Sequence, residues 1–176
     1  MSELAHRSEA NGPSNEDFSF ATEVGASSIL VVGDFARTSY AGVNKLAVDA
    51  LQETLALPQL STLSTRILLV HLANGFNHKL LNMRKAYPDM GFQCCAVFAA
   101  LSGANLHYLP VGDCRLAIQR NDALIPLNGS IWVDSAGHQL GRLITTDQKT
   151  QRGIEEPPEN VLGVHPVAHR VDYGLM

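Results

Sequence analysis

Two stretches near the start of the chain have the hydrophobic pattern of β-strands. In DFSFA, residues 17–21, Phe18 and Phe20 alternate with polar or small residues, which is typical of a strand with one buried face. SILVV, residues 28–32, is a nearly continuous apolar run and predicts a strand buried on both faces. Asp34 follows this run after one glycine, so we expect a carboxylate at the end of a buried strand.

The next two segments have the 3.6-residue periodicity of amphipathic helices. A first helix is predicted from Val43 to Leu55, ending before Pro58, and a second from about Ser64 to Ala86. The apolar stripe of the first helix consists of Val43, Leu46, Ala47, Ala50, Leu51, Thr54 and Leu55. The inner face of the second consists of Leu69, Leu72, Ala73, Phe76, Leu80 and Met83.

From residue 93 onward the pattern changes to short strand-like runs separated by turn signals. These runs are QCCAVFAAL (93–101), NLHYLPVGD (105–113), CRLAIQ (114–119) and ALIPL (123–127), and SIWVD (130–134) is a further candidate strand. Their spacing predicts an antiparallel meander. We therefore expect residues 1–14 to be a flexible arm and 15–176 to be one α+β domain, with a helix pair packed on antiparallel sheet.

The composition excludes several classes of protein. With 17% charged and 45% hydrophobic residues, the 176-residue chain is expected to be compact and globular. A net charge of −4 argues against a nucleic-acid partner, and no apolar run reaches the roughly 18 residues that a membrane helix needs. The polar N-terminus does not have the pattern of a signal peptide, and three cysteines do not make a disulfide framework, so we expect a cytoplasmic protein.

Four acidic residues are candidates for a metal site. Glu16 and Asp17 belong to NED, Asp34 follows the apolar strand, and Asp113 lies in VGDCR. Carboxylates from separate strands that converge at one end of a sheet are the ligands that Mg²⁺ or Mn²⁺ prefers. Taken singly, each acid is more typical of a turn or a cap than of a metal site.

These motifs, in this order, resemble the metal-dependent protein serine/threonine phosphatases of the 2C type. The resemblance extends from about residue 14 to residue 128 and rests on NEDFSF, ILVVGDFA, HLANGFN and the hairpin that contains VGDCR. It implies a two-sheet antiparallel β-sandwich with helices packed outside, shortened at its C-terminal end. In such enzymes a metal-activated water attacks a phosphoserine or phosphothreonine.

The resemblance also implies a role for each candidate residue. Asp34 would bridge two metal ions and the Phe35 carbonyl would donate another oxygen. Glu16 or Asp17 would bind or order the second metal. Asp113 would bind an additional, weaker one.

Several departures from the family pattern point to impaired catalysis. The position of the family's phosphate-binding arginine is Gly12, and the glycine after the bridging aspartate is replaced by Phe35. The family's later ligand aspartates have no matching motif, since the acids of that type after the meander are only Asp134, Asp147 and Asp172. We therefore expect weak Mg²⁺ or Mn²⁺ binding at most, and a pseudophosphatase that acts as a regulatory or protein-binding module.

Two alternatives stay open: an active metal-dependent phosphatase with a reduced or partner-completed site, and a structural subunit of an assembly. Because the resembled fold closes its sheets with later strands, we expect a protein partner or a second copy to cover an exposed edge. Alternatively, residues 130–176 complete the sandwich, with Val164–Val171 as an edge strand.

The remaining cysteines and histidines have simpler interpretations. Cys94 and Cys95 are expected to be packing residues of a core strand, with a reactive thiol at Cys114 as a minor alternative. His165 and His169 are expected to be exposed imidazoles of a loop rather than zinc ligands.

Overall fold

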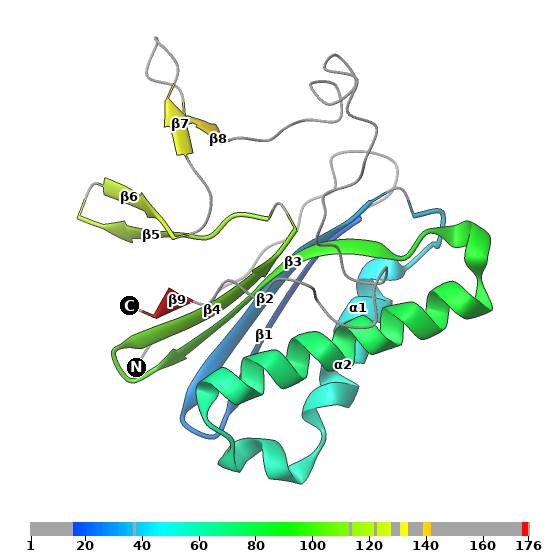
Figure 1. Cartoon of the computed structure of the whole chain (residues 1–176), viewed down its shortest axis with the longest axis horizontal. Coiled ribbons are helices and arrows are strands. Elements are labelled where there is room, and N and C mark those ends of the chain that lie inside the picture. Colours follow the sequence, from blue (N-terminus) through cyan, green and yellow to red (C-terminus); the bar gives the residue numbers. More distant parts are fainter. Residues whose placement is uncertain are drawn as a thin grey trace. The chain divides into compact units, whose positions relative to one another are not determined.

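A computed structural model describes residues 16–36, 38–112, 114–121 and 123–127, and the backbone of three short strands farther along the chain. Its main element is an antiparallel sheet of five strands in the order β1-β2-β3-β4-β9 (Figure 1). The strands are β1 (Asp17–Val24), β2 (Ser27–Ala36), β3 (Gln93–Ser102), β4 (Asn105–Val111) and the two-residue β9 (Gly174–Leu175). The predicted strands at 17–21, 28–32 and 93–111 are confirmed.

A two-residue turn sets the register of the first hairpin. Gly25 has a φ of 59° at the first loop position, where hairpin turns of type II′ favour glycine. This turn pairs Val24 with Ser27, and the ladder then runs to the pair Asp17 and Asp34.

The strand β2 does not end at Asp34, which corrects the expectation from the sequence. It continues to Ala36, and the Phe35 N–H donates a hydrogen bond of 3.2 Å to the Glu16 carbonyl. Asp34 is therefore held inside the ladder rather than in a turn after it.

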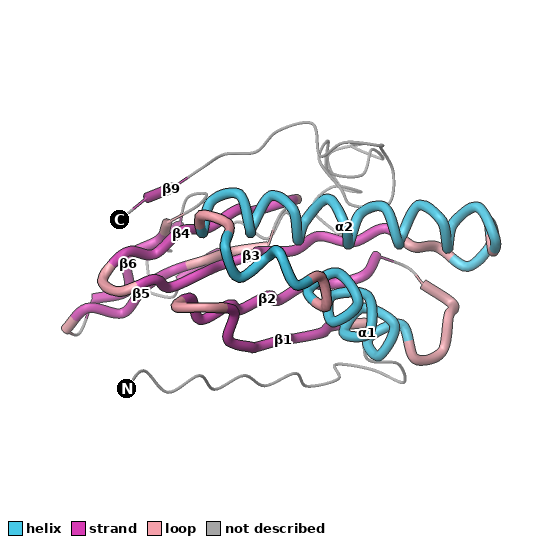
Figure 2. Tube along the Cα trace, turned by 90° about the horizontal axis from the view of Figure 1, so that it is seen from below, coloured by secondary structure: helices cyan, strands magenta, loops and turns pink. Residues whose placement is uncertain are grey.

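The two helices form where the hydrophobic periodicity places them. They are α1 (Val43–Leu55) and α2 (Thr65–Ala86), and the 3₁₀ turns η1 (Pro58–Thr62) and η2 (Pro88–Met90) follow them. Each of these 3₁₀ turns begins at a proline, which fits the first turn of a helix but not its interior. Both helices pack on the same face of the sheet (Figures 1 and 2).

The hydrophobic core lies between that face and the helices. Phe18 and Phe76 have ring centroids 5.5 Å apart, and Phe76 contacts Phe98 at 6.2 Å, so aromatic rings join β1, α2 and β3. Ile29 and Val31 of β2 are completely buried on this side. Leu30 and Val32 face the other side and are only half-buried, so the expectation of a strand fully buried on both faces is wrong.

A second compact unit, residues 115–159, is described here by itself. It contains the hairpin of β5 (Ala117–Arg120) and β6 (Ala123–Pro126) and the hairpin of β7 (Ile131–Val133) and β8 (Gln139–Gly141). The arm 1–14 and the predicted edge strand 164–171 lie outside the described residues. Among the helices that the structure describes, none is both long and apolar enough to cross a membrane.

Candidate functional site

Asp17 and Asp34 lie directly opposite each other on β1 and β2. Residues paired in this way point to the same face of a sheet, with Cβ atoms roughly 4.5–5.5 Å apart. Side chains alternate along a strand, so this face is opposite to the one that Phe18 and Gly33 present to the helices. The Asp34 side chain is exposed and that of Asp17 is partly exposed. The structure thus brings two of the predicted site residues together.

Asp17 and Asp34 belong to a row of residues that lie opposite one another on neighbouring strands. This row continues across the sheet with the thiol of Cys95 and with Gly112. On β3, Cys95 is the partner of Asp34, and continuing the register of Ala96 with Val111 places Gly112 beside Cys95. A Cβ atom added to Gly112 would lie 2.3 Å from the Cys95 sulfur, so these two residues are in close contact. The neighbours of Asp34 along this row are therefore a carboxylate on one side and a sulfur on the other.

Phe35 has its side chain on the opposite face from this row. It is 1% exposed, and its ring centroid lies 5.7 Å from that of Phe18 in the core. The bulky residue in place of the family's glycine therefore does not cover the Asp34 carboxylate. Glu16 is adjacent through its carbonyl, which accepts the Phe35 N–H. Asp113 lies outside the described residues.

The thiol of Cys94 is buried next to this row. It donates a hydrogen bond of 3.2 Å to the Cys95 carbonyl. Burial raises the pKa of the Cys94 thiol well above its ordinary value. The charges of Cys114, Cys95 and Asp34 raise this pKa further, against a smaller effect of a backbone hydrogen bond from Asp34. Cys94 is therefore a packing residue of the core, as the sequence predicted.

Asp17 and Asp34 are the candidate ligands for a hard cation that the described residues bring together. Mg²⁺ and related ions take about six oxygen ligands, some of them water, whereas thiolates suit softer metals. Asp17 and Asp34 provide two neighbouring carboxylates, and no group of three His, Cys, Asp or Glu side chains able to hold a metal occurs within the described part of the chain. Their role as metal ligands, with that of Glu16, Phe35 and Asp113, stays a prediction.

Cys95 and the pairing register are the parts of the site that the sequence interpretation missed. The sequence does contain a signal for this register. A two-residue turn at Gly25 and Ala26 pairs Val24 with Ser27, and counting outward from that pair along both strands places Asp17 opposite Asp34. The turn at Gly103 and Ala104 fixes the β3–β4 register in the same way.

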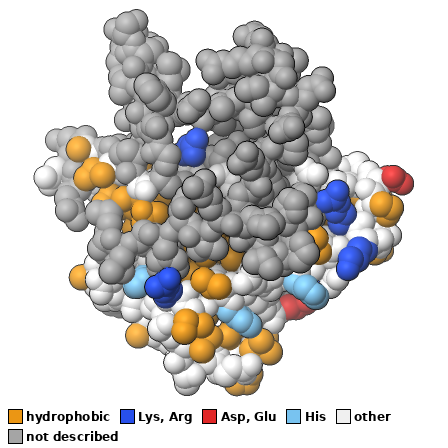
Figure 3. Space-filling model, in the orientation of Figure 1, with side chains coloured by type: hydrophobic (Ala, Val, Ile, Leu, Met, Phe, Trp, Pro, Cys, Tyr) orange, Lys and Arg blue, Asp and Glu red, His pale blue; other side chains and the backbone are white. Residues whose placement is uncertain are grey.

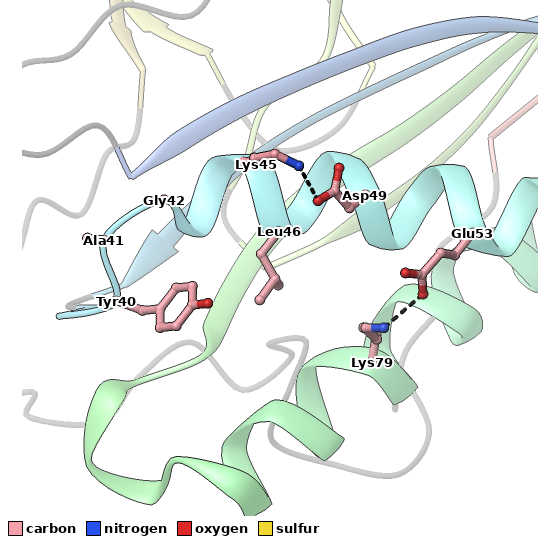
Figure 4. Close-up of a pocket in the computed structure, with 8 residues that line it drawn as sticks. All are labelled: Tyr40, Ala41, Gly42, Lys45, Leu46, Asp49, Glu53 and Lys79. Carbon is pink, nitrogen blue, oxygen red and sulfur yellow. Dashed lines mark hydrogen bonds and ion pairs between the residues drawn. The ribbon is translucent and has the colours of Figure 1, made fainter.

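A surface depression between α1 and α2 is a second feature with polar side chains (Figure 4). It has a volume of about 330 Å³. Lys45 pairs with Asp49 at 2.6 Å, and Lys79 of α2 pairs with Glu53 of α1 at 2.8 Å. Because its two lysines and two carboxylates pair with each other and are substantially exposed, the depression offers no net charge to select a ligand.

The surface drawn in Figure 3 shows no concentration of one charge among the described residues. Lys and Arg side chains are dispersed over this face, with hydrophobic, His and acidic side chains between them.

The fold is that of the metal-dependent protein phosphatases of the 2C type. A serine/threonine phosphatase from S. agalactiae superposes with a TM-score of 0.66 at 18% identity, over 97% of this chain and 71% of that one. The catalytic domain of the phosphatase PstP, solved with two manganese ions, gives a TM-score of 0.58 at 16% identity, over 97% and 68% of the two chains. PppA from Pseudomonas aeruginosa gives 0.56 at 18% identity, over 91% and 70%.

These similarities concern structure alone. No protein-family model matches the sequence, and no curated protein matches it significantly. The predicted α+β fold of the phosphatase 2C type is thus confirmed, while activity, metal binding and partners are matters for proposal.

Proposed function

We propose that this chain is a catalytically impaired phosphatase 2C-fold protein that acts as a regulatory or protein-binding module. The observation that carries the proposal is the row Asp17, Asp34, Cys95 and Gly112. Two carboxylates lie together in this row at the end of the sheet, and among the described residues the row continues beyond Asp34 with the sulfur of Cys95.

Phosphoryl transfer explains why such a row weakens catalysis. The reaction depends almost wholly on positioning and on compensation of negative charge, by metal ions and by basic side chains. A soft sulfur next to Asp34 does not help to hold a hard cation. Gly12, at the position that the resemblance gives to the phosphate-binding arginine, removes a bidentate donor as well.

The alternative is an active Mg²⁺- or Mn²⁺-dependent serine/threonine phosphatase. It is favoured by the adjacency of Asp17 and Asp34, together with Asp113, which follows the end of β4 by two residues. In that case Asp34 and Asp17 would hold the metal, which would supply an activated water. A partner protein would then complete the ligand set.

One assay separates the two proposals. We expect purified full-length protein to hydrolyse p-nitrophenyl phosphate or a phosphothreonine peptide no faster than buffer at millimolar Mn²⁺. Asp34→Asn should leave this rate unchanged, because a site without enough ligands has no activity to lose. Asp89→Asn, at an exposed carboxylate in η2, is the matched control, and circular dichroism checks the fold of each variant.

The opposite pattern would overturn the proposal. Mn²⁺-dependent turnover that falls at least about 10–100-fold in Asp34→Asn, the usual effect of disturbing a metal site, and persists in Asp89→Asn would establish an active enzyme. An active phosphatase 2C enzyme assayed in parallel shows that the conditions permit turnover.

The binding part of the proposal concerns a protein partner or a second copy of this chain. We place the protein in the cytoplasm, where three cysteines outside any disulfide remain reduced. A structural subunit without any regulatory role is the remaining alternative.

A further inference from the structure

Cys94, Cys95 and Cys114 gather where β3 begins and β4 ends. None of the three is in a disulfide. Two of them are adjacent on β3, and the third follows the end of β4 by three residues. This sulfur-rich end of the sheet is also the end that carries Asp34.

Cys114 follows by two residues a glycine that contacts the Cys95 sulfur. Gly112 touches the Cys95 sulfur and has a φ of 81°, so the chain turns sharply there instead of continuing the strand. Two residues of chain reach at most about 7 Å, which keeps Cys114 close to this contact. An electrostatic interaction with Cys114 also raises the pKa of Cys94, the neighbour of Cys95 on β3. A disulfide needs Cα atoms within roughly 4.4–6.8 Å, a separation that two residues of chain from Gly112 can span.

The three sulfurs differ in their exposure. Cys94 is 0% exposed and its thiol is bonded to a carbonyl within the core. Cys95 is 6% exposed and faces the other side of the sheet, and Cys114 is the most accessible, with intermediate exposure. An oxidant in solution therefore meets Cys114 first, and Cys95 is the sulfur beside the turn.

We propose that Cys114 and Cys95 form a reversible disulfide when the protein meets a peroxide. The Cys114 sulfur attacks the peroxide, whose O–O bond breaks, giving a sulfenic acid and one water. The Cys95 sulfur then attacks this sulfenic acid, the S–O bond breaks, and a second water leaves. The protein loses two electrons and two protons, and a thiol reductant restores both thiols.

Such a bond joins the start of β3 to the segment that follows β4. That segment includes Asp113, and Cys95 is the direct partner of Asp34. The reversible disulfide would thus lie at the same end of the sheet as the carboxylate pair. Its formation does not depend on whether the protein is an active phosphatase.

The test is oxidation of the full-length protein with equimolar hydrogen peroxide, followed by chymotryptic mapping under non-reducing conditions. Chymotrypsin cleaves between the two cysteines, at Leu101 and Tyr108, so a bond appears as two linked peptides. Because Cys94 and Cys95 are adjacent, variants distinguish between them. The linked peptides should form in wild type and in Cys94→Ser, disappear in Cys95→Ser and Cys114→Ser, and separate with dithiothreitol.

Three results would overturn the proposal. They are a link that survives Cys95→Ser, a disulfide between two chains, and conversion of Cys114 to sulfinic or sulfonic acid with no link. Circular dichroism of the reduced protein shows whether Cys95→Ser folds. If it does not, the other two variants decide the outcome: the link should be lost in Cys114→Ser, at a half-buried position, and kept in the Cys94→Ser control.

Discussion

Gly112 has a backbone conformation and a neighbour that both exclude a side chain. Its φ of 81° lies in the left-handed region, and an added Cβ would approach the Cys95 sulfur at 2.3 Å and the Cys95 Cβ at 2.8 Å. Gly103, at the tip of the β3–β4 turn, has a φ of 60° but nothing within 4 Å of its would-be Cβ. An alanine at Gly103 would therefore have only the unfavourable backbone conformation, whereas an alanine at Gly112 would have that conformation and a steric clash with Cys95.

We expect Gly112→Ala to destabilise the protein more than Gly103→Ala. The left-handed conformation costs either alanine about 1–2 kcal/mol. Crowding against Cys95 adds about 1–3 kcal/mol at Gly112 alone. Urea unfolding of the reduced proteins measures both changes. Equal losses for the two variants would show that Cys95 does not pack against Gly112.

Phe35 illustrates how one residue can depart from a family pattern without blocking a site. Strand alternation sends its ring into the core beside Phe18, while the neighbouring Asp34 carboxylate points to the other face. The Phe35 side chain therefore affects core packing more than access to the Asp34 carboxylate.

The packing of α1 against α2 depends on a small residue. A Cβ at Gly75 of α2 would lie 2.5 Å from the Thr54 Cγ2 and 2.9 Å from its Oγ1. The Thr54 hydroxyl is held by a hydrogen bond of 2.8 Å to the Ala50 carbonyl, so it cannot rotate away without losing that bond. Gly75 therefore permits the close approach of the two helices at this point.

A double-mutant cycle tests this contact. Gly75→Ala gains about 1 kcal/mol of helix propensity but loses about 1–3 kcal/mol to overpacking, so we expect a net loss of stability. In the Thr54→Ala background the two clashing atoms are gone, and Gly75→Ala should become neutral or stabilising. The same effect of Gly75→Ala in both backgrounds, measured by urea unfolding, would contradict this helix contact.

Elements with a strong hydrophobic period could be predicted from the sequence. Both helices and the strands β1 to β4 appear where the patterns place them, because burial of one face decides their structure. The end of β2 could not be placed, since the bond from Phe35 to Glu16 comes from pairing between strands rather than from local preference. The two-residue β9 exists only through its pairing with His107 and Tyr108 of β4.

The candidate site was predicted only in part. The resemblance named Asp17 and Asp34, and the hairpin register brings them together. The sulfur beside Asp34 was missed because Cys95 appeared to be one more residue of an apolar run, and a hydrophobic pattern does not reveal which neighbour a residue has across the sheet.

At the scale of the whole molecule, a shared fold does not decide the chemistry of a site. The PstP catalytic domain has this fold and two manganese ions at 16% identity. In this chain the described end of the sheet presents two carboxylates followed by a thiol. A shared architecture therefore leaves the chemistry to be decided by a few side chains.

The proposed function implies that the carboxylate pair of Asp17 and Asp34 does not hold a divalent cation. Anomalous diffraction from crystals grown with equimolar Mn²⁺ tests it most directly. We expect no manganese peak between the carboxylates of Asp17 and Asp34. A manganese ion about 2.0–2.6 Å from both carboxylates, with further protein oxygens or waters completing its shell, would contradict the account.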